Sequence, residues 1–130
     1  MLTDAGRDLI ASAVFNTSTQ PAAANYMALT ANSAAVNASD TSLTGEITTG
    51  GGGLIRKQGV YAHTGGTATA TITATFTANG SDSVPVTIAK YGLFNAASSG
   101  TMAYSKVLTT TATISASGDA LTLTATFTIS

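Results

Sequence analysis

Side chains that could carry nucleophilic or acid–base chemistry are few in this sequence. His63 is the only histidine, and there is no cysteine. A serine nucleophile needs a base and an orienting group beside it, and His63 has no companion at a familiar spacing. We interpret His63 as a surface residue at the end of a strand. The sequence therefore predicts a protein without a catalytic site, and not an enzyme.

The acidic residues are also spread singly along the chain. Most fall at expected helix caps or turns, where a carboxylate accepts hydrogen bonds from nearby backbone N–H groups. Their spacing matches neither a calcium-binding loop nor a cluster of histidine and carboxylate ligands. We therefore predict no metal site and no cofactor. The residues considered are Asp4, Asp8, Asp40, Glu46, Asp82 and Asp119.

Four glycines at 50–53 invite comparison with a phosphate-binding loop. Such a loop continues through Gly-Lys-Ser/Thr into a helix, whereas here Leu54, Ile55, Arg56 and Lys57 lead into an expected strand. We interpret the glycines as a pliable connection. The adjacent pair Arg56–Lys57, close to Tyr61, is either a contact patch or a solvated basic face.

Composition excludes several functional classes. The 130 residues carry five basic and six acidic side chains, with Arg56–Lys57 the only adjacent basic pair. A nucleic-acid-binding surface needs a cluster of basic residues, so we expect no binding of nucleic acid. The sequence has no apolar run of membrane-spanning length, and its first residues lack the pattern of a signal peptide, so we expect no membrane association. Threonine is the commonest residue, with 25 copies. A surface solvated by hydroxyls instead of charges is prone to association.

The length predicts a single domain, residues 1–130, with one helix at 3–15. Thr3 is the expected N-cap, and Asp4 follows in the first turn, where the helix dipole favours an anion. Gly6 weakens a helix and indicates close packing against a sheet. The apolar stripe expected to face the sheet consists of Leu2, Gly6, Leu9, Ile10, Ala13 and Val14.

From residue 25 the pattern changes to the period of a strand. Residues 67–77 alternate strictly between threonine and apolar side chains, as a strand with one buried face does. Strands recurring between Gly/Asn turns predict an all-β fold, an antiparallel β-sandwich of the jelly-roll or Ig-like kind, over residues 25–130. The other expected strands are 26–31, 54–63, 84–93, 102–108, 109–116 and 120–130, the last two forming a hairpin.

The segment 69–77 combines high β-propensity with no charge and no proline. A free edge on such a strand would associate with other chains unless a neighbour covered it. This pattern favours an oligomer.

Several segments, taken in order, resemble a family of small virion proteins of tailed bacteriophages. The most distinctive is Ile-Ala-Lys-Tyr-Gly-Leu-Phe-Asn-Ala at 88–96 with Gly-Thr-Met at 100–102, which is similar to a strand–turn–strand unit of tail-fibre and head-accessory chains. The other matching segments are 2–10, 25–29, 43–47 and 53–56.

The resemblance implies a non-enzymatic virion protein that decorates or cements the capsid by bridging neighbouring shell subunits. The alternative is a tail, neck or fibre accessory, including an adhesin that binds host glycan through exposed tyrosine and asparagine side chains. The expected partners are the major capsid protein or other virion proteins and further copies of the chain, with a trimer favoured. The expected location is the virion, assembled in the host cytoplasm. The candidate contact residues are Leu9, Arg56, Lys57, Tyr61, Tyr91, Leu93 and Phe94.

Overall fold

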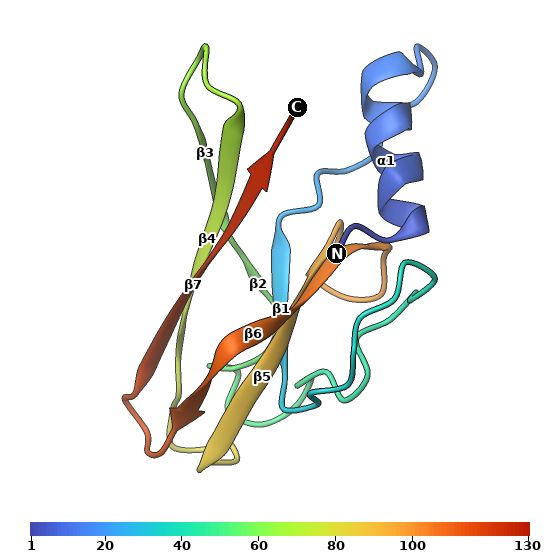
Figure 1. The fold of residues 1–130 in the computed structure, drawn as a ribbon. Helices are drawn as coiled ribbons and strands as arrows, with labels where there is room; N and C mark the ends of the chain where they lie inside the picture. The colour runs from blue at the N-terminus through green and yellow to red at the C-terminus, as the bar shows by residue number, and fades with distance from the viewer.

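The computed structural model describes residues 1–130 as two antiparallel sheets and one helix (Figure 1). Sheet A has the order β2-β1-β5-β6, and sheet B has the order β3-β4-β7. The predicted all-β sandwich with an N-terminal helix is confirmed. The elements are α1 (Asp4–Phe15), β1 (Tyr26–Thr30), β2 (Lys57–Gln58), β3 (Val60–His63), β4 (Thr69–Thr77), β5 (Val86–Phe94), β6 (Met102–Ile114) and β7 (Ala120–Thr128).

The main core fills the space between the two sheets. The apolar positions of the alternating strand β4 point into it, and Phe76 is fully buried there, while the threonines point outward. Strand β4 thus buries one face, as the period of two predicts. The core consists of Met27, Leu29, Leu54, Ile72, Ala74, Phe76, Ala78, Ile88, Tyr91, Leu93, Ile114 and Ala125.

Sheet A buries part of its second face as well, whereas the pair Thr87–Thr113 on that face is exposed. A smaller cluster on that face is formed by Ala28, Phe94 and Met102 with Leu43 from the long loop after β1. The same loop accepts a hydrogen bond from the buried Lys90, whose Nζ lies 3.0 Å from the Ala34 carbonyl oxygen. Sheet A is therefore the central layer, and only sheet B presents a whole face to solvent.

Helix α1 begins where the sequence predicts. The Thr3 hydroxyl accepts the Gly6 N–H at 2.9 Å and caps the helix. Gly6 is buried against β6, where an added Cβ would lie 2.1 Å from the Ala103 carbonyl oxygen. The predicted close packing at Gly6 is confirmed.

The C-terminal part of the predicted apolar stripe is wrong. Ile10, Ala13 and Val14 are exposed, and so is Phe15 at the end of the helix. The helix meets the sheet through its first turns, at Gly6 and the half-buried Leu9, and its C-terminal half extends beyond the sheet (Figure 1). The apolar spacing in α1 therefore defines one face of the helix, and the sandwich covers this face only at its N-terminal end.

Two predictions about strand pairing are also wrong. Residues 102–108 and 109–116 form one strand, β6, whose register against β5 shifts between Ile88 and Lys90. The last two strands do not form a hairpin, because β7 pairs with β4 along its whole length. The turn after β6 crosses from sheet A to sheet B, where the Gly118 N–H donates to the Ala78 carbonyl oxygen at 2.7 Å.

The Asn79–Gly80 turn likewise connects the two sheets instead of closing a hairpin. It leads from β4 in sheet B to β5 in sheet A, where β5 pairs with β1 and β6. Strand β4, whose uncharged sequence raised the question of a free edge, lies between β3 and β7. Strand β7 covers one edge of β4 along its whole length, and β3 covers residues 70–73 of the other edge.

Candidate functional site

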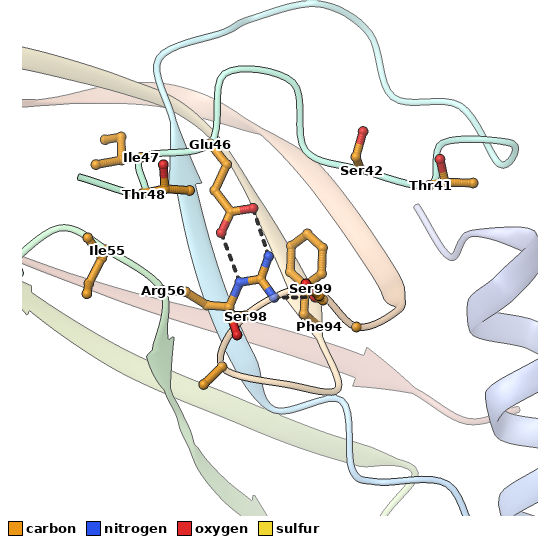
Figure 2. Close-up of a pocket in the computed structure, with 12 residues that line it drawn as sticks. Thr41, Ser42, Glu46, Ile47, Thr48, Ile55, Arg56, Phe94, Ser98 and Ser99 are labelled. Atoms are coloured by element: carbon orange, nitrogen blue, oxygen red, sulfur yellow. Dashed lines mark hydrogen bonds and ion pairs between the residues drawn. The ribbon is translucent and has the colours of Figure 1, made fainter.

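A pocket of about 460 Å³ lies on the outer side of sheet A, between the loop before β2 and the turn after β5 (Figure 2). Arg56 and Glu46 stand at its centre. The pocket is lined by Thr41, Ser42, Glu46, Ile47, Thr48, Ile55, Arg56, Phe94, Ala97, Ser98, Ser99 and Gly100.

The Arg56 guanidinium ties three segments of the chain together. Its Nε and Nη2 donate to the two carboxylate oxygens of Glu46, at 2.9 and 2.8 Å. Its Nη1 donates to the carbonyl oxygens of Ala96 and Ser99, at 2.9 and 2.7 Å. The guanidinium carbon also lies 3.6 Å from the centre of the Phe94 ring, a cation–π distance.

This arrangement corrects both alternatives for Arg56, because the side chain is neither part of an open contact patch nor on a solvated basic face. The side chains of Arg56 and Glu46 are only 8% and 14% exposed. A forked pair with additional carbonyl acceptors is the geometry in which arginine is preferred to lysine. Arg56 therefore holds the pocket together, and sequence reasoning missed this because Glu46 was only one of several isolated carboxylates.

The pocket lining combines hydroxyl groups with apolar side chains. Five of its lining residues carry hydroxyl groups, each able to donate and to accept. The sole histidine lies elsewhere, on the exposed strand β3, where its Nδ1 is 2.8 Å from the Thr69 carbonyl oxygen. The hydroxyl-bearing residues are Thr41, Ser42, Thr48, Ser98 and Ser99.

Two of the other carboxylates serve local structure. Asp119 accepts the N–H groups of Ser115 and Ala116, and Asp40 accepts that of Asn37, each within one turn. No three histidine or carboxylate side chains come together in a way that could hold a metal ion.

Asp82 anchors the glycine run that the sequence suggests is pliable. Its carboxylate accepts the N–H groups of Gly51 and Gly53, at 2.9 and 3.2 Å, and that of Asn79 at 2.9 Å. An added Cβ on Gly53 would lie 2.0 Å from the Thr77 carbonyl oxygen. These glycines allow a close approach of two backbones, and the loop is fixed to the end of β4.

The predicted contact residues do not form one surface. Tyr91, Leu93 and Phe94 are buried, at 4%, 1% and 3% exposure, because β5 lies between β1 and β6 and both faces of sheet A are covered at these residues. Their side chains are not available to a partner, which corrects that part of the prediction. For Leu9, Lys57 and Tyr61 the contact role stays a prediction.

Tyr61 is the most accessible of these three. Its side chain on β3 is 63% exposed. Lys57 is half-buried, and its Nζ donates to the Thr75 carbonyl oxygen at 3.0 Å. Leu9 is half-buried on α1, away from both.

The outer face of sheet B, which we call the threonine face, combines side chains far apart in sequence. Cross-strand partners are threonines on both strands, and the hydroxyls of Thr73 and Thr124 lie 3.0 Å apart, those of Thr75 and Thr122 2.8 Å apart. None of its side chains is charged. The face consists of Val60, Ala62, Thr69, Thr71, Thr73, Thr75, Thr77, Ala120, Thr122, Thr124, Thr126 and Thr128.

No protein-family model matches this sequence, and no curated protein matches it significantly. No helix in the structure has the length and apolar character needed to cross a membrane.

Proposed function

We propose that the protein is a non-enzymatic structural component of a bacteriophage virion that decorates or cements the capsid by bridging neighbouring shell subunits. The observation that carries the proposal is the threonine face. Packing a partner against it removes no ionised side chain from water, and burying ionised groups is what makes contact between proteins costly. Depletion of charge is also what distinguishes the centre of protein interfaces.

The anchored loops support the same role. Arg56 and Asp82 each join segments that are distant in sequence, so the long connections are already ordered before a partner binds. Binding then does not require flexible loops to become ordered. Such ordering costs free energy and weakens association in proteins whose interface loops are mobile. In this proposal the partners are the major capsid protein or other virion proteins together with further copies of the chain, and the location is the virion.

The decisive measurement is the copy number of the chain in purified particles of the phage that encodes it, by quantitative mass spectrometry against the major shell protein. A copy number comparable to that of the shell protein supports decoration of the capsid. A few copies to a few dozen support a neck, tail or fibre component. Absence from particles overturns both structural roles.

A matched pair of variants tests the threonine face itself. Thr124→Lys places a charge on this face, whereas Thr113→Lys places the same charge on sheet A; each residue belongs to a cross-strand threonine pair, with hydroxyl distances of 3.0 and 3.1 Å. We expect Thr124→Lys to lose incorporation into particles at least tenfold and Thr113→Lys to retain it. Equal incorporation of the two variants contradicts docking through this face.

The pocket favours a second candidate, a tail, neck or fibre accessory that binds host glycan. Its volume of about 460 Å³ lies within the range of small-molecule sites, and its hydroxyl lining matches sugar hydroxyls. A glycan array probed with the protein and with Ser98→Val tests this candidate. Binding that Ser98→Val weakens supports it, and no binding of any saccharide overturns it.

A further inference from the structure

Strand β7 is the one long sheet edge that the molecule leaves unprotected. The edge strands β2 and β3 have only two and four residues. Strand β6 is longer, but its register is interrupted, it carries the exposed Lys106, and residues Met1 to Thr3 cover part of its edge through hydrogen bonds at Ala103 and Ser105. Short strands, irregular register, charges and covering segments are the usual means of preventing edge-to-edge association.

Strand β7 has none of these features. It runs for nine residues, Ala120–Thr128, in unbroken register with β4, and it contains no charge and no proline. Its other edge has no partner strand. A regular and uncharged edge of this length is a template for another strand.

The backbone groups on that edge can be identified from the pairing with β4. The Ile129 N–H donates to the Ala68 carbonyl oxygen at 2.7 Å, and the Asp119 carbonyl oxygen accepts the Ala78 N–H at 2.9 Å. Odd-numbered residues of this strand therefore direct their backbone groups toward β4. Because these directions alternate in an antiparallel strand, the even-numbered residues Thr122, Thr124, Thr126 and Thr128 direct theirs to the open edge.

We propose that β7 pairs antiparallel with β7 of a second copy of this chain about a two-fold axis at Ala125, joining the two copies of sheet B into one six-stranded sheet. The inference stands on the strand edge alone and does not depend on the proposed function. In this register Thr124 lies opposite Thr126 of the second copy, and each pair exchanges two N–H···O bonds through the groups that now point to solvent.

Side-chain alternation selects this geometry. An axis on a residue pairs odd positions with odd and even with even, so threonines meet threonines on the outer face and apolar side chains meet on the inner face. An axis between residues would place each threonine opposite an apolar side chain. Among axes on residues, Ala125 brings Leu121 opposite Ile129 and leaves Asp119 outside the paired segment, whereas an axis at Thr124 sets Asp119 against Ile129.

The exposure of the inner face supports the second copy as the occupant. Ala125 is buried between the sheets, and Phe127 is half-buried with its ring centre 5.0 Å from that of Tyr104 on sheet A. Ile129, just after the strand, is 73% exposed because sheet A does not extend over this end of the chain. The two-fold places Phe127 opposite Leu123 of the second copy. Each copy thereby covers apolar side chains that the other leaves in water.

Size-exclusion chromatography with light scattering tests the association. We expect a dimer for the native chain and a monomer for Thr124→Pro, because proline removes an N–H from the open edge without removing a bond to β4. Thr124→Val keeps this N–H and is the matched control, expected to remain a dimer. A native chain that stays monomeric at high micromolar concentration, or that forms a trimer, overturns the proposal.

Cysteine cross-linking tests the register and remains informative if Thr124→Pro fails to fold. The native chain has no cysteine, so engineered thiols are the only ones present. Mixing Thr124→Cys with Thr126→Cys is expected to give disulfide-linked heterodimers under mild oxidation, since residues directly opposite lie within disulfide reach. Each variant alone is expected to give few disulfide-linked dimers. Self-linking of Thr124→Cys, or no linking in the mixture, overturns the proposed register.

Discussion

Arg56 and Glu46, ten residues apart in sequence, form a forked ion pair that closes the outer side of sheet A, with Nε–Oε1 and Nη2–Oε2 distances of 2.9 and 2.8 Å. Both side chains are largely removed from water. Removing one partner of such a pair lowers the stability of the fold, because the other partner is then left as an uncompensated buried charge.

We expect Arg56→Ala to lower the free energy of unfolding by about 3–5 kcal/mol, the cost of breaking a buried pair. Arg56→Lys should recover only part of the loss, since an ammonium cannot form the fork or stack flat on Phe94. Urea denaturation measures both. Lys57→Ala is the control, with a loss of less than about 1 kcal/mol expected for an exposed contact. Equal effects at the two positions would contradict the role assigned to Arg56.

The contact of Gly6 with Ala103 predicts the effect of the smallest substitution in the helix. Gly6→Ala raises helix propensity, but its Cβ would lie 2.1 Å from a backbone oxygen. We expect a loss of about 1–3 kcal/mol from overpacking and faster hydrogen exchange throughout α1. Gly80→Ala, where the added Cβ meets nothing within 4 Å, is the control. A more stable Gly6→Ala protein would show that the helix is not docked at this residue.

The hydrogen bonds of the Asp82 carboxylate hold the glycine run in place, and we predict that replacing this carboxylate loosens the loop. Asp82→Asn replaces an acceptor of three N–H groups by an amide whose NH₂ cannot accept, so a buried N–H is left unsatisfied. We expect a loss of about 1–3 kcal/mol and faster hydrogen exchange at Gly51 and Gly53. Asp8→Asn, on the exposed side of α1, is the control, with little change expected. Unchanged exchange at the two glycines in Asp82→Asn would refute the anchoring role.

The burial of Tyr91 leads us to expect a loss of stability in alkali. Burial, with the neighbouring Tyr104 adding to it, raises the pKa of Tyr91 well above its ordinary value. In the unfolded chain Tyr91 ionises near pH 10, while in the folded protein it stays neutral, so the unfolded state binds fewer protons and stability falls as pH rises above about 10. Tyr91→Phe should flatten this decline, as measured by urea unfolding at pH 9 to 11. Tyr61→Phe is the comparison variant, and an equal flattening there would contradict the assignment.

The sequence by itself determined the local features of the fold. The alternation at 67–77 and 121–129 defines which side chains of β4 and β7 face the core, because successive residues of a strand point to opposite sides. Thr3 and Gly6 likewise indicate where α1 begins and where it packs. Each of these features depends on neighbours within a few residues, which the sequence shows directly.

Only the tertiary structure decided which strands are neighbours and which charges meet. Alternation specifies the face of a strand but not its partner, and any two extended segments can form the same backbone hydrogen bonds. This is why β7 was expected beside residues 109–116 and lies beside β4. The pairing of Arg56 with Glu46, the burial of Tyr91 and the open edge of β7 all follow from that long-range choice, because each depends on segments that fold back from distant parts of the chain.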